Sequence, residues 1–292
     1  MTTDNDKIVE QLCHQPDGTA SILKRTKGRL PSGQRLKEIM QLIREVMFPD
    51  FFAEVAPSPN VLRHVTAVRL EDIRTELATQ IRRAARIGEK PDIDSNAVAE
   101  AFIAHLPELR SLLLTDVDAM FENDPAAIDR AEIIFCYPAF TGMLHYRIAH
   151  ALLTAGVPLL PRMITEMAHS RTGIDIHPGA VIGPYFSIDH GTGVVIGETS
   201  RIGCHVSIYQ GVTLGAKNFV LDSNGHPLNV PRHPIIEDHV TIYSNATILG
   251  RITIGSHAVI GGNLWVTSDV PAYARLNQRQ AVDQRFIDGA GI

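Results

Sequence analysis

Two different hydrophobic periods divide the chain. In the first part, apolar residues recur at three- and four-residue steps over residues 36–47 and again over residues 68–84, as along one face of an amphipathic helix. Gly88 is placed to end the second of these helices. We therefore predict an all-α domain over residues 1–165, whose apolar faces form its core or contact other subunits.

Further helix signals lie near the end of this domain. Asp124 followed by Pro125 predicts a helix start, because a carboxylate can cap the first N–H groups and proline suits the first helical position. That helix should end near Tyr137. The next should occupy about residues 139–155 and end at Gly156.

In the second part, aliphatic residues recur every six positions. Thirteen positions follow this period, and all are Ile, Leu or Val: Ile176, Ile182, Ile188, Ile196, Ile202, Ile208, Leu214, Ile236, Ile242, Ile248, Ile254, Ile260 and Val266. The period is typical of a solenoid in which each hexad is one short strand and three hexads complete a triangular coil. We predict that the recurring residue points inward, and that glycines after it, such as Gly183 and Gly197, form tight corners.

Composition supports a boundary between the two parts. Residues 1–170 carry 42 of the 59 charged residues but 6 of the 22 glycines, whereas residues 171–292 carry the other 17 charges and 16 glycines. We therefore place the solenoid domain at residues 166–272. It contains an inserted loop at residues 217–231 and is followed by a tail at residues 273–292.

The overall composition narrows the class of protein. With 45% hydrophobic and 20% charged residues, the chain is typical of a globular protein, and its net charge of −5 gives no basic surface for nucleic acid. Three widely spaced cysteines, Cys13, Cys136 and Cys204, indicate free thiols in a reducing compartment. Because no secretory signal or long apolar stretch is present, we expect a cytoplasmic protein with no membrane and no nucleic-acid partner.

Departures from the six-residue period are the places to look for chemistry, since a regular solenoid has no pocket of its own. The first is the Asp189-His190 pair, with Asp175 about two hexads earlier on a neighbouring edge. A histidine with a carboxylate partner is the usual general base, because the acid fixes the ring tautomer and stabilises the imidazolium. A solvated surface pair is the alternative interpretation.

The second departure is the inserted loop, which ends at Arg232-His233. Residues 222–225 (Asp-Ser-Asn-Gly) predict a turn at its tip. A polar excursion of this length favours a lid or a binding loop, and the planar guanidinium of Arg232 suits a carboxylate or a phosphate. An ordinary surface loop with incidental charges is the alternative.

The thirteen histidines do not resemble a metal-ligand set. Solenoid enzymes that bind zinc bring three imidazoles together from neighbouring coils, typically with a histidine pair five positions apart. The one pair at this spacing, His145 and His150, lies on a predicted helix, where five residues turn the chain by about 140°. We therefore expect no metal.

Five stretches of the solenoid form a distinctive set of motifs: DIHP (Asp175–Pro178), IDHGTGVVIGET (Ile188–Thr199), VSIYQGVTLG (Val206–Gly215), RHP (Arg232–Pro234) and ATILG (Ala246–Gly250). This set resembles the serine O-acetyltransferase family, and residues 124–126 and 145–150 resemble that family's last helical segments. The likeness covers roughly residues 115–266. It implies an N-terminal α-helical domain followed by a left-handed parallel β-helix.

The resemblance also implies a reaction. The enzyme would transfer an acetyl group from acetyl-CoA to the hydroxyl of L-serine, giving O-acetylserine and CoA for cysteine biosynthesis. His190 would be the general base, with Asp175 as its orienting partner, and the serine oxygen would attack the thioester directly.

Further roles follow from the same motifs. Arg232 and His233 would hold the substrate carboxylate or the oxyanion, which makes His233 a catalytic residue as well as a binding one. Asp124 and Asp189 would hold the substrate ammonium group, partly across neighbouring chains.

The family's partners complete this set of expectations. Gly215, Ser244 and Gly262 lie where the family's backbone approaches the CoA arm. L-cysteine would compete at the serine site as a feedback inhibitor. The chain would form a homotrimer, or a hexamer as a dimer of trimers, and its tail ending in Ile292 would dock into O-acetylserine sulfhydrylase.

Three alternatives stay open from the sequence. The enzyme could acetylate another small hydroxylated amino acid such as homoserine, because its inserted loop is longer than in the common short forms of the family. The β-helix could be a catalytically silent scaffold that only binds partners. It could also be a metal-dependent hydratase on the same fold.

Overall fold

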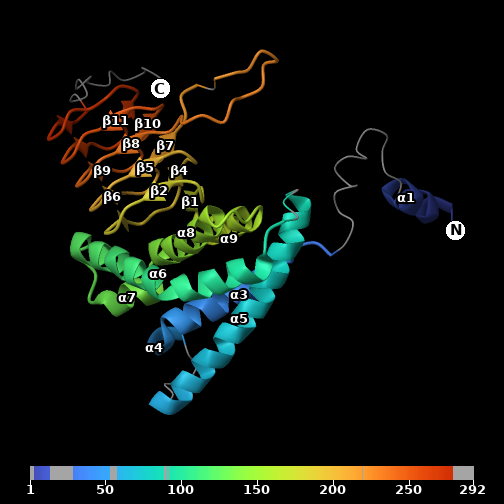
Figure 1. Cartoon of the computed structure of the whole chain (residues 1–292). Coiled ribbons are helices and arrows are strands. Elements are labelled where there is room, and N and C mark those ends of the chain that lie inside the picture. The colour runs from blue at the N-terminus through green and yellow to red at the C-terminus, as the bar shows by residue number, and fades with distance from the viewer. Residues whose placement is uncertain are drawn as a thin grey trace. The chain divides into compact units, whose positions relative to one another are not determined.

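The computed structural model describes residues 3–13, 29–52, 58–88, 90, 92–218 and 220–278. Figure 1 shows its elements in chain order along the colour bar. The helices are α1 (Thr3–Cys13), α3 (Gly33–Met47), α4 (Pro49–Phe52), α5 (Pro59–Ile87), α6 (Ser95–Asn123), α7 (Arg130–Cys136), α8 (Pro138–Thr154) and α9 (Leu160–Thr172). Among these described helices, none combines the length and the apolar character that crossing a bilayer needs.

The helices predicted from the three- and four-residue period are present. α3 begins after Ser32, whose hydroxyl accepts the Arg35 N–H at 3.3 Å and so caps the helix. α5 ends at Ile87 and is capped by Gly88, whose N–H donates to the Ala84 carbonyl. α8 is followed by Gly156, which adopts a left-handed φ of +81° as a helix-ending glycine does.

The predicted helix start at Asp124 is wrong. α6 continues up to this residue, and α7 begins only at Arg130, where the side chain of Asp129 caps the first turn. Asp124 instead accepts the Ala126 N–H at 2.8 Å within the intervening turn. An aspartate that bonds to the backbone two residues later makes a turn, and this local bond competes with helix capping.

The chain divides into two compact units. One comprises residues 1–110 and 148–164, and the other comprises residues 111–147 and 165–292. The second unit therefore combines the strands with the C-terminal part of α6, with α7 and with the first part of α8. All the candidate site residues lie in this second unit.

The strands are short and are separated by corners. They are β1 (Asp175–Ile176), β2 (Val181–Ile182), β3 (Ser187–Ile188), β4 (Val195–Ile196), β5 (Arg201–Ile202), β6 (Ser207–Ile208), β7 (Thr213–Gly215), β8 (Ile235–Ile236), β9 (Thr241–Ile242), β10 (Thr247–Leu249), β11 (Thr253–Ile254), β12 (Val259–Ile260), β13 (Trp265–Val266) and β14 (Arg275–Leu276). Three parallel sheets result: sheet A (β1-β4-β7-β10-β13), sheet B (β11-β8-β5-β2) and sheet C (β14-β12-β9-β6-β3). Successive strands thus belong to different sheets, which makes each coil triangular.

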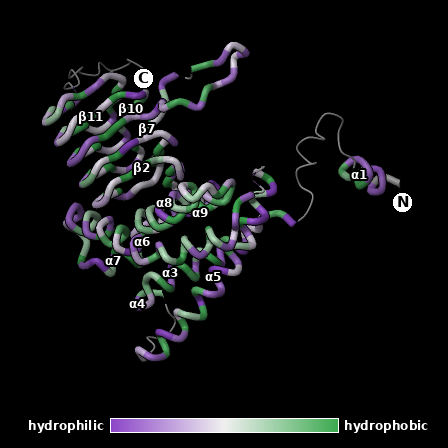
Figure 2. Tube along the Cα trace, in the orientation of Figure 1, coloured by the Kyte–Doolittle hydropathy of each residue, from purple (hydrophilic) through white to green (hydrophobic). Residues whose placement is uncertain are grey.

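The interior of the coils is the predicted aliphatic stack. All thirteen aliphatic residues of the six-residue period are buried, and none is more than 6% exposed. The register places Ile176 on Ile196 and Ile196 on Leu214, so the side chains pile up along sheet A. A second inward set, including Phe186 and Val206 at 0% exposure, was not predicted. Figure 2 shows the resulting alternation of hydrophobic and hydrophilic residues around the coils.

The corners use two kinds of residue. The predicted corner glycines lack room for a side chain: a Cβ on Gly183 would come within 2.6 Å of the Gly203 carbonyl oxygen. The left-handed backbone conformation is adopted instead by other corner residues, such as Tyr185 with φ of +57°. The glycines are therefore needed for close contact between coils and not, as predicted, for the turn itself.

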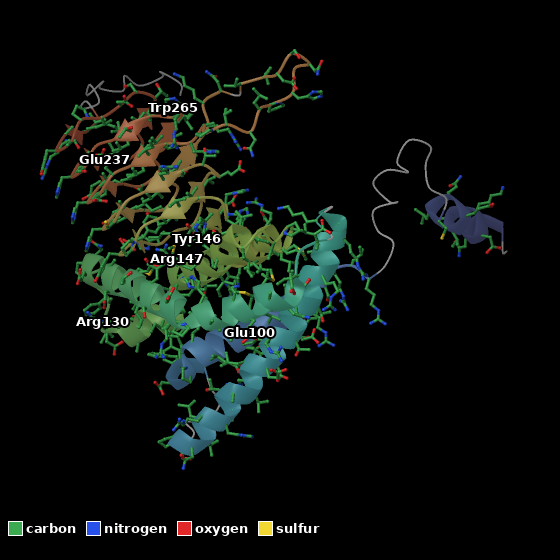
Figure 3. The ribbon with its side chains drawn as sticks, in the orientation of Figure 1. Glu100, Arg130, Tyr146, Arg147, Glu237 and Trp265 are labelled. Atoms are coloured by element: carbon green, nitrogen blue, oxygen red, sulfur yellow. The ribbon has the colours of Figure 1, made fainter. Side chains whose placement is uncertain are left out.

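A buried ion pair joins α8 and α6 to the first coil. Arg147 donates from Nε and Nη2 to both carboxylate oxygens of Asp116, at 3.1 and 3.0 Å, and the two side chains are 4% and 1% exposed. The same guanidinium donates to two carbonyls of the first coil at 2.5 and 2.7 Å. The neighbouring Tyr146 hydroxyl donates to the Ala180 carbonyl at 2.7 Å. In Figure 3, Tyr146 and Arg147 are labelled where α8 meets the coil.

Candidate active site

His190 lies at the corner between sheets C and A, after β3 and before β4. Its backbone is left-handed, with φ of +56°, and its side chain is 72% exposed. The ring Nδ1 lies 3.8 Å from Oδ1 of Asp189, which is 26% exposed. The structure thus presents an accessible imidazole with a carboxylate beside it.

Asp124 and Tyr137 lie close to this imidazole. The Tyr137 hydroxyl donates to Oδ2 of Asp124. This bond, the Ala126 N–H and the nearby charge of His190 hold the pKa of Asp124 below its ordinary value. The bond to Asp124 also raises the pKa of Tyr137, and the carboxylate of Asp189 adds to that shift. Two carboxylates therefore lie near one imidazole, an arrangement that suits a substrate ammonium group.

Asp175, on β1, belongs to a group with two side chains of α9. The ligand atoms of Asp175, Glu166 and His169 all lie within 4.8 Å of one another, and His169 Nδ1 is 3.3 Å from Glu166 Oε2. Two carboxylates and an imidazole are a chemically reasonable ligand set for a divalent cation. The pairing of Asp175 with His190, and the absence of a metal, both stay predictions.

Arg232 and His233 lie at the corner between sheets A and B, after the inserted loop and before β8. Arg232 donates from Nη2 to Glu198 Oε2 at 2.6 Å. The hydroxyl oxygen of Thr199 accepts the backbone N–H groups of Arg232 and His233, at 2.9 and 3.1 Å. Arg251 donates to the carbonyls of Thr199 and His233, at 2.7 and 2.9 Å. The corner is therefore fixed by backbone and side-chain hydrogen bonds.

The ring of His233 is neutral and has a defined tautomer. The Thr199 N–H donates to Nδ1 at 3.1 Å, so Nδ1 is an acceptor and the ring proton is on Nε2. Burial, and then the charge of Arg232, lower the pKa of His233 to about 4. The ring occupies a slot left by Gly197, because a Cβ there would come within 2.0 Å of it. His233 can therefore donate a hydrogen bond from Nε2 at neutral pH.

We expect His233 to destabilise the folded chain as the pH falls from about 6.5 to about 4. The folded pKa is about 4, and the unfolded chain has the ordinary histidine value of about 6.5, so the unfolded state binds more protons in this range. The contribution of the neutral His233 ring to the unfolding free energy is fully present above pH 6.5, and about 3 kcal/mol of it is lost by pH 4. His233→Asn, whose amide oxygen can still accept the Thr199 N–H, should reduce this pH dependence of urea unfolding.

The control for this measurement is His226→Asn. His226 is an exposed side chain of the inserted loop, 78% accessible, and its replacement should leave the pH dependence unchanged. All three proteins are compared at one protein concentration, since association contributes to stability. An unaltered pH dependence in His233→Asn would contradict the prediction.

The inserted loop is a short hairpin. Leu221 and Pro227 form an isolated antiparallel bridge, and the Asp222 N–H donates to the His226 carbonyl at 2.8 Å. At the tip Gly225 has φ of +81°, which places the turn where the sequence predicted it. In Figure 1 the loop projects away from the stacked coils, in orange.

The predicted CoA-contact residues follow two edges of the solenoid. Ser244 and Gly262 come after β9 and β12, at the same sheet C to sheet A corner as His190 but in later coils. A Cβ on Gly262 would come within 3.0 Å of the Ser244 carbonyl oxygen. Gly215 ends β7 on the other side of sheet A, where the absent side chain makes room for Leu249. The CoA contacts themselves stay predictions.

Within one chain, His190 and the predicted substrate-binding residues form two separate groups. His190 and Asp189 lie at the corner between sheets C and A, with Asp124 near them in the turn before α7, whereas Arg232 and His233 lie at the corner between sheets A and B. The width of sheet A separates these corners. A single copy therefore does not bring the two groups together.

Several side chains near these corners were not predicted as site residues from the sequence. Tyr137 and Tyr209 lie near Asp124 and Asp189. The hydrogen bond to Asp124 is the main cause that raises the pKa of Tyr137, burial is the main cause that raises the pKa of Tyr209, and both carboxylates add to each shift. Thr199 positions the Arg232 corner from a different coil. Thr199 and Tyr209 lie within two of the quoted motifs, but the motifs do not show which residues they contact, because stacking between coils, and not sequence distance, brings these side chains together.

Comparison with known proteins gives the family of the chain. The family described as bacterial transferase hexapeptide (six repeats) matches residues 233–268. A protein named serine acetyltransferase, plasmid, from Synechococcus elongatus is 45% identical over 275 residues, which cover 90% of this chain and 86% of the relative. The chain belongs to the serine acetyltransferase family. It is therefore an acetyl-transferring enzyme.

Solved serine acetyltransferases share the fold. Isoform 3 from Entamoeba histolytica, in complex with cysteine, has a TM-score of 0.73 and 35% identity, with 86% of this chain and 84% of that chain covered. The enzyme from Neisseria gonorrhoeae in complex with serine has a TM-score of 0.55 and 28% identity, with 84% and 96% covered. The predicted fold class, an α-helical region followed by a left-handed parallel β-helix, is confirmed.

Proposed function

We propose that this serine acetyltransferase family member transfers the acetyl group of acetyl-CoA to the hydroxyl of L-serine, giving O-acetylserine and CoA for cysteine biosynthesis. The observation that supports this most directly is the accessible imidazole of His190, which lies near two carboxylates, Asp189 and Asp124. This arrangement offers a base for a hydroxyl and counter-charges for the ammonium group of the same substrate.

His190 acts as the general base in this proposal. Its neutral imidazole takes the proton of the serine hydroxyl while the serine oxygen forms a bond to the thioester carbonyl carbon, giving a tetrahedral oxyanion. The oxyanion then collapses, the carbon–sulfur bond breaks, and the leaving thiolate takes the proton back from the imidazolium. Asp175 orients the ring and stabilises its charged form.

Arg232 and His233 act on the other end of the substrate. The guanidinium suits the serine carboxylate, and its bond to Glu198 at 2.6 Å holds it in place. The Nε2 proton of the neutral His233 ring is a donor for the developing oxyanion. The Thr199 N–H bound to Nδ1 keeps this proton on Nε2, and burial keeps the ring neutral above a pH of about 4.

The complete site requires a second copy of the chain, since one copy separates the two corners. In a homotrimer with sheet A of every copy facing the threefold axis, the His190 corner of one copy lies beside the Arg232 corner of the next. The outer face of sheet A carries apolar side chains, Val195 at 38% and Trp265 at 71% exposed, which such contacts would bury. Trp265 is labelled in Figure 3. A hexamer would pair two such trimers.

A thiol-release assay tests the function. The purified enzyme and acetyl-CoA are mixed in turn with L-serine, homoserine, threonine and simple sugars, and free CoA thiol is measured. We expect the highest kcat/KM with L-serine. A higher kcat/KM with homoserine than with L-serine would assign homoserine as the substrate. Release of CoA only with sugars would overturn the assignment to an amino acid. No release with any acceptor would favour a silent scaffold, and stoichiometric zinc or iron with no release would favour a hydratase.

L-cysteine is the proposed feedback inhibitor. It carries the same ammonium and carboxylate groups as L-serine, and the structure of the Entamoeba histolytica relative holds cysteine. In our proposal cysteine competes for Asp124, Asp189 and Arg232, so it raises the KM for serine and leaves kcat unchanged.

The C-terminal tail is proposed to dock into O-acetylserine sulfhydrylase. Ile292, the terminal residue, lies outside the described residues. Deleting Ile292 should abolish binding to a sulfhydrylase, measured by titration calorimetry, and should leave the rate of thiol release unchanged. Equal binding by the shortened chain would defeat this proposal.

A further inference from the structure

Three side chains with metal-binding chemistry meet where α9 leads into β1 (Figure 1). One ligand atom from each of Glu166, His169 and Asp175 lies within 4.8 Å of the other two. In the part of the chain that the structure describes, this is the one group of three such side chains found together. The proposed acetyl transfer uses Asp175 but neither of the two side chains from α9. We call these three residues the α9–β1 cluster.

The turn between α9 and β1 brings the cluster together. Gly173 follows the helix with a left-handed φ of +72°, and its N–H donates to the His169 carbonyl at 2.8 Å. Two residues later, the Asp175 N–H donates to the Val194 carbonyl of the next coil at 2.9 Å. Asp175 is therefore held beside the last turns of the helix by the backbone, and not by the chance position of a surface side chain.

The two side chains from α9 already have the spacing of metal ligands. Glu166 and His169 are three positions apart, so they lie on one face of the helix. His169 Nδ1 lies 3.3 Å from Glu166 Oε2 in a hydrogen bond, so the ring nitrogen is turned toward the carboxylate. Two ligands of one tetrahedral zinc ion, each bound at about 2.1 Å, are about 3.4 Å apart. This nitrogen and this oxygen therefore need almost no change in separation to share an ion.

Asp175 supplies the third ligand. Its carboxylate oxygen lies within 4.8 Å of both other ligand atoms, so it must approach them by up to about 1.4 Å to bind the same ion. The side chains of Glu166 and His169 are 43% and 44% exposed, which gives them room to rotate and gives water access to a fourth position. The two carboxylates also supply two negative charges for a divalent cation.

We propose that Glu166, His169 and Asp175 bind a divalent transition-metal ion such as Zn²⁺, with water as the fourth ligand. A mixed set of imidazole and carboxylate ligands suits this ion. The site departs from the expectation of no metal that was drawn from the sequence. That expectation considered sets of imidazoles, and it did not consider carboxylates that a helix and a strand bring to one histidine.

The ion would inhibit acetyl transfer, a consequence that rests on the proposed function. Asp175 is the proposed orienting partner of the general base, His190. A carboxylate bound to a divalent cation stabilises an imidazolium less well, since the charge of the ion outweighs that of the carboxylate. The bound ion therefore lowers kcat, because the charged form of the base becomes less favourable as the hydroxyl proton is transferred.

The binding test uses the full-length, untagged protein after a chelator has removed metal. Zn²⁺ is titrated by calorimetry, and bound zinc is counted after dialysis. We expect about one ion per chain. His169→Ala should weaken binding by about 10-fold or more, because the loss of groups that only support a ligand already costs about 10- to 100-fold. Glu166→Gln, which keeps the size of the side chain, should weaken binding in the same way.

The matched control is His105→Ala. His105, on α6, also has a carboxylate three positions away, with its Nδ1 2.7 Å from Glu108 Oε2, and its side chain is 45% exposed. No third ligand joins this pair among the described residues, so its loss should not change the affinity for zinc. No zinc uptake, or wild-type affinity in both His169→Ala and Glu166→Gln, would overturn the proposal.

Inhibition is measured by the loss of thioester absorbance of acetyl-CoA, since the released thiol itself binds zinc. Wild-type enzyme should lose activity as Zn²⁺ binds and recover it with a chelator, whereas His169→Ala should keep its own zinc-free rate. Zinc binding without inhibition, or equal inhibition of His169→Ala, would overturn the inhibitory role. The zinc-free rate with L-serine tests the proposed function separately, and a hydratase would transfer no acetyl group with or without the ion.

Discussion

Replacing His190 with asparagine should lower kcat by about 10²- to 10⁴-fold, the usual contribution of a general base. In the proposed mechanism, no other group takes the hydroxyl proton as the serine oxygen attacks the thioester. The backbone should tolerate the change, because asparagine accepts the left-handed φ of +56° at this corner. The measurement is the rate of CoA thiol release at saturating L-serine and acetyl-CoA.

The control for this loss is His257→Asn. His257 is also exposed and left-handed, with φ of +61°, but it lies at the corner between sheets B and C. Its replacement should leave the rate unchanged, which separates the chemistry of the ring from any general cost of the substitution. A wild-type rate in His190→Asn would show that the base is another group.

Replacing Arg147 with methionine should cost about 3–5 kcal/mol of unfolding free energy. Asp116 would remain buried, at 1% exposed, without the guanidinium that now donates to both of its oxygens. Two carbonyls of the first coil would lose their donors as well. The measurement is urea unfolding at pH 7 and a fixed protein concentration.

Arg130→Met provides the matched comparison. Arg130 pairs with Asp118 on the surface, where the two side chains are 54% and 36% exposed, so its loss should cost about 1 kcal/mol or less. Equal losses in the two variants would mean that burial does not set the strength of these pairs. Adding Asp116→Leu to Arg147→Met should recover part of the loss, since it removes the unpaired buried charge.

The solenoid was predictable because its period follows directly from its geometry. Each coil repeats the same inward position, so Ile242 and Ile260 must be aliphatic whatever else the chain does, and both are fully buried. The helices were predictable for the same reason, since a buried face imposes a period. Motif resemblance supplied the family, which comparison with relatives confirmed. It also supplied the roles of His190 and Arg232, which stay predictions.

What the sequence could not show depends on contacts between coils. Asp124 carries a helix-start signal, yet its carboxylate is used by a turn and by the Tyr137 hydroxyl. Gly197 looked like a turn residue, and its missing side chain instead makes the slot for the ring of His233. Tyr137 and His233 come from elsewhere in the chain, so no local pattern records these two contacts.

The inserted loop leaves and re-enters the coil at one corner. This arrangement determines which part of the chain can change in length without changing the coils. Leu214 and Ile236, on either side of it, are buried in the ordinary register of their coils, so loop length is decoupled from the core. Doubling such a loop costs only about 0.6 kcal/mol in closure entropy. The loop ends directly at Arg232, so its length and composition can change next to this residue while the coils on either side keep their register.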